Sequence, residues 1–131
     1  MIGAEKDRSL AAKVQVAAGI PISDLTGRLS LGMLGALLKT SSLLISNDSG
    51  PVHIASAVGT PVISIFGRNQ PGLSPVRWRP LGENARVVWK NVGCDPCLAH
   101  NCEIHFLCLD VISVEDVLTE VDALIEVPAK K

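Results

Sequence analysis

The sequence predicts an α/β fold, an open and mostly parallel sheet with helices on both faces. Two apolar runs of strand length, residues 43–45 and 62–66, enclose a short helical segment, which is the order of a βαβ unit. Neither run alternates with polar residues, as is typical of parallel strands covered on both faces. Helical patterns precede this unit, and a further strand and helix follow it. The chain of 131 residues is therefore interpreted as one Rossmann-like domain over residues 1–127.

Two helices are predicted before the βαβ unit. The first covers residues 5–18, after a strand end at residues 1–3 and before a short extended piece at residues 21–23. Its apolar side chains share one face at helical spacing: Leu10, Val14 and Ala17. Ser30 is expected to cap the second helix. The apolar stripe of that helix consists of Leu31, Leu34, Leu37 and Leu38.

The βαβ unit contains the most informative turn of the chain. Pro51 suits the first turn of a helix, where its missing N–H costs nothing. Gly59, just before Pro61, suits a left-handed cap at the end of that helix. The turn 47–50, Asn-Asp-Ser-Gly, thus joins the carboxyl end of a strand to the amino end of a helix. Open α/β sheets bind ligands at this edge, and the helix dipole there favours an anion.

The rest of the chain is predicted as a loop, a strand, an excursion and a helix. Residues 68–82 are rich in Pro and Gly and indicate a long irregular loop, followed by a strand at 85–89. Residues 91–110 contain the cysteines. Ser113 and Asp116 form an approximate capping box for a helix that ends near residue 126, before a tail at 128–131. The buried face of this helix is expected to consist of Val114, Val117, Leu118, Val121 and Leu124.

Two interpretations of the turn at residues 47–50 stay open. In the first it only starts a helix, with Ser49 or Gly50 as the N-cap and Asp48 bonding the local backbone. In the second it binds an anion. His53 favours the second, because a histidine in the first helical turn can donate to a phosphate. Asp48 would then hold the loop or accept the hydroxyls of a sugar.

Composition excludes several classes of protein. The chain has 12 basic and 13 acidic residues, and it shows no basic stripe with interleaved aromatics, so nucleic acid is not an expected partner. Apolar residues make up 47% of the chain, with two Phe, two Trp and no Tyr, so the core is expected to be aliphatic. Neither a membrane span nor a secretory leader is recognised. A cytoplasmic location is expected.

The segment 47–67 closely resembles the nucleotide-sugar-binding segment of the family 9 glycosyltransferases, the lipopolysaccharide heptosyltransferases of bacteria. Two more stretches are similar to that family and stand in the right order, residues 2–7 and residues 24–38. The resemblance runs from about residue 2 to residue 124. It implies the C-terminal half of a GT-B glycosyltransferase.

The resemblance implies an ADP-activated sugar as the donor substrate. It places the substrate-binding residues at Glu5, Thr26, Gly27, Asn47, Asp48, Ser49, Gly50 and His53. Glu5 would accept ribose hydroxyls, although an acidic residue in a first helical turn also suits the helix dipole. Arg28 fits either the same pocket or a solvated surface. Gly67 is expected to leave room where the following loop passes the ligand.

The implied reaction is a displacement at the anomeric carbon with the nucleoside diphosphate leaving. Helix amides after Gly50 and His53 would stabilise that charge, so no cofactor or metal is required. The family's catalytic base and its site for a lipid-linked saccharide acceptor lie in an N-terminal domain. No catalytic residue is therefore assigned here, and this chain alone is expected to bind a nucleotide sugar weakly without transferring it. A peripheral position at the inner face of the cytoplasmic membrane and self-association are further expectations.

Two other classes of function are considered. A different GT-B-like sugar-nucleotide enzyme, such as an epimerase or a transferase with a uridine donor, would share the phosphate-binding βαβ unit. A non-enzymatic nucleotide-binding or interaction module would use the same fold without catalysis. Protection by ADP rather than by UDP or GDP separates the first class from the family that the chain resembles, and absence of any nucleotide effect would indicate a module without nucleotide binding.

Four cysteines lie in the excursion 91–110, namely Cys94, Cys97, Cys102 and Cys108. A Cys-x2-Cys pair is a plausible first half of a zinc site. The following spacings match no common zinc finger or ribbon, and a cytosolic location disfavours disulfides. A structural metal site, reduced thiols and disulfides all stay open. Many members of the resembled family have a similar loop, which implies no new function.

Overall fold

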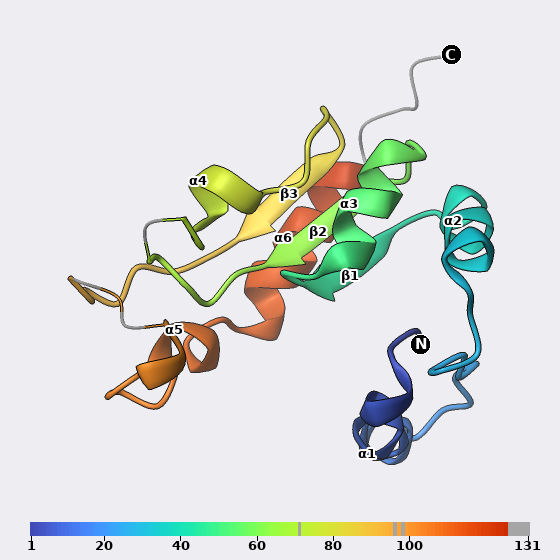
Figure 1. Cartoon of the computed structure of the whole chain (residues 1–131), viewed down its shortest axis with the longest axis horizontal. Coiled ribbons are helices and arrows are strands. Elements are labelled where there is room, and N and C mark those ends of the chain that lie inside the picture. Colours follow the sequence, from blue (N-terminus) through green and yellow to red (C-terminus); the bar gives the residue numbers. More distant parts are fainter. Residues whose placement is uncertain (71, 96, 98, 126–131) are drawn as a thin grey trace. The chain divides into compact units, whose positions relative to one another are not determined.

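Two compact units make up the chain, Met1–Leu37 and Leu38–Lys131. The computed structural model describes residues 1–70, 72–95, 97 and 99–125, and Figure 1 traces their elements. The tail expected at residues 128–131 lies outside the described residues. One domain over residues 1–127 stays a prediction.

The second unit contains a parallel sheet in the order β1-β2-β3. The strands are β1 (Leu44–Asn47), β2 (Val62–Ile65) and β3 (Ala85–Val88), each within two residues of its predicted position. Leu44 pairs with Val62, which in turn pairs with Ala85. Because the strands run in one direction, their carboxyl ends share one edge, from which the turn after β1 projects.

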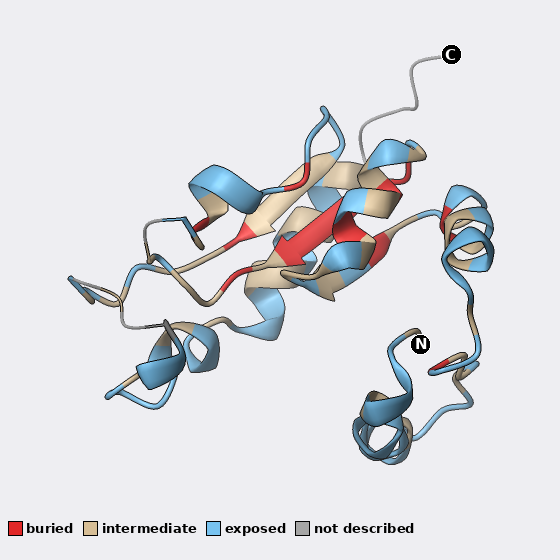
Figure 2. Cartoon of the chain, in the orientation of Figure 1, coloured by how far each residue is buried: buried red, intermediate tan, exposed pale blue. Residues whose placement is uncertain are grey.

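Helices cover both faces of this sheet (Figure 1). On one face α3 (Gly50–Ala57) packs against β1 and β2, and on the other α6 (Val114–Ile125) packs against β2 and β3. The central strand β2 is consequently the most buried element (Figure 2). The fully buried apolar side chains are Val52, Ala55, Val62, Ile63 and Phe66. Burial of each large one stabilises the fold by about 1.5–3 kcal/mol, so the βαβ unit is a firm support for the turn.

Helix α3 ends as the sequence predicts. Gly59 has φ 84°, in the left-handed region. Its N–H donates to Ser56 O at 3.2 Å, and the N–H of Thr60 donates to Ala55 O at 2.9 Å. This pair of hydrogen bonds satisfies two of the last helical carbonyls, as in a Schellman motif.

A short helix interrupts the loop between β2 and β3, which the sequence had led us to expect as irregular throughout. Helix α4 (Pro75–Trp78) begins after Ser74, with Pro75 in its first turn. The N–H of Arg79 bonds to Pro75 O at 3.0 Å. The prediction was wrong here because one turn is too short to show helical periodicity, although a serine followed by a proline is a helix start signal.

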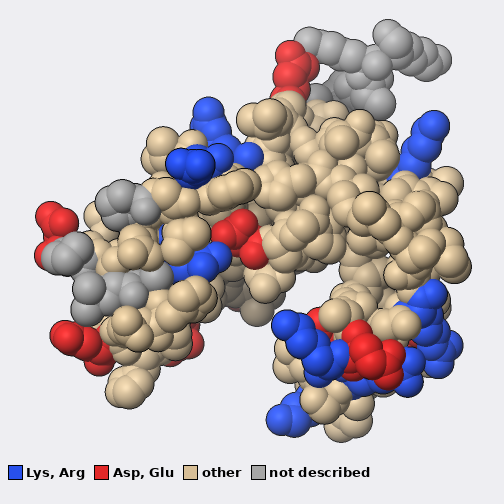
Figure 3. All heavy atoms as spheres, viewed as in Figure 1, with Lys and Arg blue, Asp and Glu red and all other residues tan. Residues whose placement is uncertain are grey.

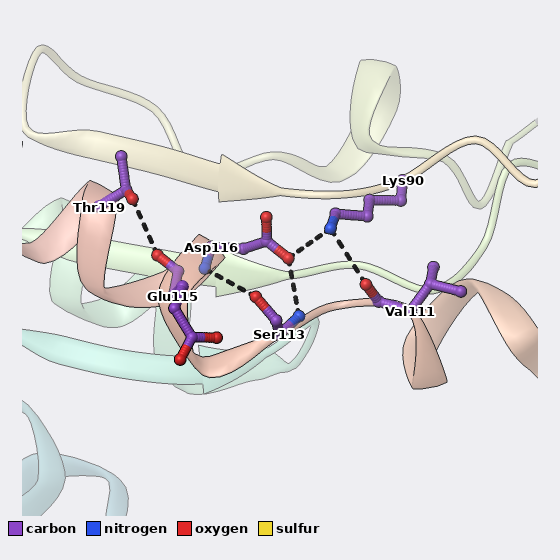
Figure 4. A network of polar contacts seen from close by, with 6 residues as sticks. All are labelled: Lys90, Val111, Ser113, Glu115, Asp116 and Thr119. Carbon is purple, nitrogen blue, oxygen red and sulfur yellow. Dashed lines mark hydrogen bonds and ion pairs between the residues drawn. The ribbon is translucent and has the colours of Figure 1, made fainter.

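Helix α6 begins with a complete capping box (Figure 4). The N–H of Asp116 donates to Ser113 Oγ at 3.2 Å, and the N–H of Ser113 donates to Asp116 Oδ2 at 2.7 Å. Lys90, just after β3, forms an ion pair with Asp116 at 2.5 Å and donates to Val111 O at 3.0 Å. Further along, Arg86 of β3 lies 3.7 Å from Glu120 of α6. These contacts fix α6 along β3.

The inward face of α6 differs from the predicted one. Val117, Val121 and Leu124 are partly buried as expected, whereas Val114 and Leu118 are 68% and 50% exposed. Asp116 and Glu120 are partly buried and occupy part of the inward face instead. They do so because Lys90 and Arg86, at β3, form ion pairs with them. Periodicity in apolar residues cannot anticipate an ion pair with another element.

The excursion at residues 91–110 contains two short helices, η2 (Ala99–Asn101) and α5 (Leu107–Asp110). Helix α5 returns to the sheet edge, where Leu109 covers Gly67. A Cβ added at Gly67 would lie 2.6 Å from Leu109 Cγ. Gly67 therefore makes room for Leu109 rather than for a passing ligand, which corrects the sequence-based expectation.

The first unit contains η1 (Glu5–Asp7), α1 (Arg8–Ala18) and most of α2 (Leu31–Lys39). Residues 1–3 are not assigned as a strand, but Met1 O and Gly3 O accept the N–H groups of Leu25 and Gly27, both at 2.9 Å. This spacing is that of a parallel pair of extended segments.

The predicted stripe on α1 is not a buried face. Leu10 and Val14 are 62% and 44% exposed, and Ala17 is exposed as well; Ala11 is the buried residue of the helix. The stripe on α2 is graded, from exposed Leu31 to buried Leu38. Ser30 does cap α2, because its Oγ accepts the N–H of Met33 at 3.3 Å.

Charges of both signs are interspersed around α1 on the face shown in Figure 3, in line with the nearly balanced composition. An example is the ion pair of Arg8 with Glu5 at 3.0 Å. Among the described residues, no helix has the length and apolar character needed to cross a membrane.

Candidate functional site

The turn after β1 is held by backbone bonds on both sides. Asn47 ends β1, and the N–H of Asp48 donates to Ile65 O of β2 at 3.0 Å. Ser49 has extended backbone, φ −157° and ψ 166°, and occupies the N-cap position of α3. Its hydroxyl does not cap the helix; it lies 3.2 Å from Ser46 Oγ. The turn is thus positioned by the sheet, and the Ser49 side chain is engaged with β1.

Asp48 forms an ion pair that links the ends of two neighbouring strands. Arg68 Nη2, shortly after β2, lies 3.1 Å from Asp48 Oδ2. The side chains are 29% and 18% exposed respectively, so the pair is half-buried and less screened than a surface bridge. Arg68 was not among the site residues predicted from the sequence. Its signal was its place just after Gly67, at the same sheet edge as Asp48.

His53 projects from the first turn of α3 and is exposed. Its ring meets Trp78 of α4 edge to face, with centroids 6.3 Å apart and planes at 67°. Trp78 is fixed in turn, because its Nε1 donates to Gly72 O at 2.6 Å and the Arg77 guanidinium lies 5.5 Å from its ring centroid. Trp78 was also missed, since the loop containing it was predicted to be irregular.

Fewer amides face outward at the start of α3 than the sequence suggested. Pro51 has no N–H, and the N–H of Val52 already donates to Ser49 O at 3.2 Å. The helix amides after Gly50 were expected to stabilise an anion, and this is wrong for the N–H of Val52, which is already paired. The N–H of exposed Gly50 and the ring of His53 are the donors best placed for an anion.

The remaining predicted site residues lie in the first unit, where Glu5 and Gly27 are in contact. Glu5 is exposed and bonds to Arg8. Gly27 has φ 72°, and a Cβ there would lie 2.2 Å from Glu5 Oε2. Thr26 is 2% exposed, and its N–H donates to Asp24 Oδ1 at 2.9 Å. Hydrogen bonds from Thr26 hold the pKa of Asp24 below its ordinary value.

Arg28, the alternative candidate next to Gly27, is exposed. Its N–H donates to Leu25 O at 3.1 Å, which closes the turn around Gly27. Glu5, Gly27 and Arg28 thus belong to one surface of the first unit, whereas Asn47, Asp48, Ser49, Gly50 and His53 belong to the second unit.

A cavity of about 270 Å³ lies at the carboxyl edge of β2 and β3. Arg68 follows β2 and Lys90 follows β3, and both line it. So do all four cysteines, Cys94, Cys97, Cys102 and Cys108. The thiol of Cys108 donates to Gly67 O, and Cys102 Sγ accepts the N–H of Phe106 at 3.2 Å.

The cysteines form no disulfide within the described residues. Burial of Cys108, and then the nearby Cys102, raise the pKa of the Cys108 thiol above its ordinary value. In the part of the chain that the structure describes, no three His, Cys, Asp or Glu side chains are gathered closely enough to hold a metal ion. The thiols share one cavity, but their sulfur atoms do not converge.

One protein family has a model that matches most of this chain. The family model described as glycosyltransferase family 9 (heptosyltransferase) matches residues 1–107. The chain is 34% identical over 126 residues to a lipopolysaccharide heptosyltransferase 3 of Escherichia coli, covering 94% of this chain and 36% of the relative. It is 38% identical over 105 residues to the lipopolysaccharide heptosyltransferase 3 of Escherichia coli strain K12, covering 80% of this chain and 29% of the relative. The chain spans about a third of the length of these relatives.

One solved structure has the same fold. It is described as the structure of E. coli ADP-heptose lps heptosyltransferase II, and the TM-score is 0.70 at 24% identity. The match covers 95% of this chain and 35% of that one. The predicted α/β fold with an open parallel sheet is thus confirmed, as is the resemblance on which the predicted site was based.

Proposed function

This chain belongs to glycosyltransferase family 9 (heptosyltransferase), and we propose from that premise that it provides the donor-binding part of a heptosyltransferase-like glycosyltransferase. The donor is an ADP-activated sugar. The acceptor is a lipid-linked saccharide of the lipopolysaccharide core, bound by a part of the enzyme beyond this chain. Relatives named lipopolysaccharide heptosyltransferase support this assignment.

The observation that carries the proposal is the turn at residues 47–50, placed between the carboxyl end of β1 and the amino end of α3. Diphosphate groups favour this position in α/β folds because the helix dipole and free amides point toward it. Gly50 lets the ligand approach the backbone, since no atom lies within 4 Å of a Cβ built there. His53 supplies a side-chain donor beside it.

Asp48 and Arg68 have different roles when the donor binds at this turn. In the free protein Arg68 neutralises Asp48. When the donor binds, Arg68 can turn its guanidinium to the diphosphate, which it matches as a bidentate donor. Asp48 is then available to accept a sugar hydroxyl. As the bond to the anomeric carbon breaks, Gly50 N–H, His53 and Arg68 stabilise the charge on the leaving diphosphate.

Nucleotide binding by the purified chain tests the proposal. ADP is expected to raise the melting temperature more than UDP or GDP does, because it should bind more tightly. A ligand at 100 times its Kd adds about 2.7 kcal/mol to the free energy of unfolding. His53→Ala should weaken ADP binding about tenfold, the value of one charge-assisted hydrogen bond. His100→Ala, an exposed histidine of the excursion, should leave it unchanged.

NMR locates the site in the same experiment. ADP should shift the amide resonances of residues 48–50, 52 and 53 and of Arg68, and leave those of α6 in place. A chain whose melting temperature and amide spectrum do not respond to any nucleotide would overturn the proposal and favour a module without nucleotide binding.

A further inference from the structure

The cavity at the carboxyl edge of β2 and β3 concentrates the sulfur of the whole chain. The sequence contains four cysteines, and all four line this one cavity although they are spread over fifteen residues, 94–108. Gly67 and Lys90, at the carboxyl edge of the sheet, line the same cavity. The nucleotide-binding role proposed above makes no use of these thiols.

We propose that Cys94, Cys97, Cys102 and Cys108 bind one thiophilic divalent metal ion, with zinc as the expected ion, and that this ion fixes the excursion to the sheet edge. Four cysteine ligands in tetrahedral array are the usual set of a structural zinc site. None of the four cysteines belongs to the proposed nucleotide-binding turn.

Two of the four sulfur atoms are already held in place by the backbone, Cys102 Sγ by an N–H donor and Cys108 Sγ by a carbonyl acceptor. Phe106 donates its N–H to Cys102 Sγ at 3.2 Å, and such a donor stabilises negative charge on sulfur. The Cys108 thiol donates to Gly67 O, which places it at the end of β2; a metal–sulfur bond would replace this hydrogen bond, because the thiolate has no proton to donate. Cys102 and Cys108 thus supply an oriented half of the site, and the Cys-x2-Cys pair supplies the other half.

Cations in the cavity wall balance the charge of the proposed centre. Zinc with four thiolates carries a net charge of −2, which is costly to bury without compensation. Arg68 and Lys90 both line the cavity. Each has one carboxylate partner, Asp48 and Asp116 respectively, and each has further N–H donors that can face the thiolates.

Metal binding must draw the sulfur atoms together, since no three of these side chains in the described residues are close enough to hold an ion. Zn–S bonds of about 2.3 Å place the four sulfurs about 3.8 Å apart. The backbone between Cys102 and Cys108 can supply this movement. His105 and Phe106 have φ 49° and 62°, a left-handed conformation that is unfavourable for residues other than glycine. A rearrangement of this segment can therefore relieve backbone strain.

The step is a ligand exchange without oxidation. Four S–H bonds break, four S–Zn bonds form, and four protons leave to solvent, so the metal-bound centre is Zn(S-Cys)4 with charge −2. Acidification should release the metal because the thiolates regain their protons.

Metal content of the full chain, purified anaerobically from zinc-supplemented cells, tests the proposal. One zinc per chain is expected. The variants Cys94→Ser/Cys97→Ser and Cys102→Ser/Cys108→Ser should each lose it, whereas His100→Ala should keep it. Removal of zinc by a chelator and reloading with Co2+ should give thiolate-to-cobalt charge-transfer absorption, a readout that needs no variant and is unaffected by a variant that fails to fold.

Three results would overturn the inference. They are a wild-type metal content no higher than that of the two double-serine variants, reloading with Co2+ without charge-transfer absorption, and alkylation showing disulfides in the anaerobic protein.

A mercurial reagent added to the zinc-loaded chain should release zinc as the thiols react. ADP binding serves as a separate readout, so failure of either proposal leaves the other intact.

Discussion

Gly27 is placed against Glu5 in a backbone conformation that suits glycine. Its φ of 72° is left-handed, and an added Cβ would lie 2.2 Å from Glu5 Oε2 and 3.0 Å from Glu5 Cα. Since the second of these atoms is backbone, it cannot move aside as a flexible side chain does. The turn that presents Glu5 therefore depends on the absence of a side chain at residue 27.

We predict that Gly27→Ala destabilises the chain by more than left-handed strain alone would, which costs about 1–2 kcal/mol. Gly19→Ala measures the strain by itself, because Gly19 has φ 64° but no atom within 4 Å of the added Cβ. Gly32→Ala, in exposed α2, should stabilise by about 0.5–1 kcal/mol. Urea unfolding ranks the three variants. Equal stability of the Gly27 and Gly32 variants would refute the argument.

The ion pair of Asp48 with Arg68 is the residue-scale contact on which the proposed site depends. Both side chains are less than a third exposed, so their attraction is only partly screened. A double-mutant cycle with Asp48→Asn and Arg68→Gln should give a coupling of about 1 kcal/mol. Arg79→Gln, at an exposed position two residues after Arg77, is the control for loss of a positive charge. A coupling near zero in low salt would mean that Arg68 does not hold Asp48.

At the scale of elements, α6 is joined to β3 by the polar network of Lys90, Ser113 and Asp116 (Figure 4). Hydrogen bonds from Lys90 first, and then from the Ser113 backbone, lower the pKa of Asp116 below its ordinary value of 3.8. A carboxylate with a lowered pKa stabilises the folded chain above its unfolded pKa. That contribution is lost as the pH falls through the lowered pKa.

This network predicts how stability depends on pH. At pH 6 Asp116→Asn should unfold at lower urea than the wild type, and the difference should shrink at pH 3 and below. Asp122→Asn, at an exposed position on the same helix, controls for loss of a carboxylate outside the network. A difference that persists unchanged at low pH would show that packing, not the charge of Asp116, stabilises the start of α6. Ser113→Ala should cost about 1 kcal/mol at either pH, as loss of an N-cap does.

Apolar periodicity identified helices better than it identified what they pack against. Residues 5–18 were correctly predicted to be helical, with η1 as the first turn and α1 as the rest. The stripe of Leu10 and Val14 is nevertheless exposed. Period 3.6 follows from local backbone geometry, whereas burial requires a second element on that face. The capping box of α6 was predictable for the same reason, because its partners are three residues apart.

At the scale of the whole molecule, burial is concentrated in one unit. Ala11 and Thr26 are the buried residues in Met1–Leu37, whereas the second unit contains the covered strand β2 and the inner side of α3. Local opening costs least where few apolar groups are buried. We therefore predict that amides of α1 exchange with deuterium much faster than those of β2. Hydrogen exchange measured by mass spectrometry on the full chain checks this. Equal protection of α1 and β2 would contradict it.

The sequence by itself determined the βαβ unit, the place of the turn at residues 47–50 and the family. These rest on local signals, namely apolar runs, Pro51 and Gly59, each of which acts within a few residues through backbone sterics and hydrogen bonds. Asp48, Gly50 and His53 could be named as candidates for this reason.

The tertiary structure decided which side chains meet. Arg68 reaches Asp48, Trp78 contacts His53, and Leu109 fills the space above Gly67. Each pair joins residues at least twenty positions apart, brought together by strand pairing and by the packing of α4 and α5 at the sheet edge. Such contacts depend on the folded path of the chain, since loop closure and side-chain packing act between elements and leave no periodic trace in the sequence.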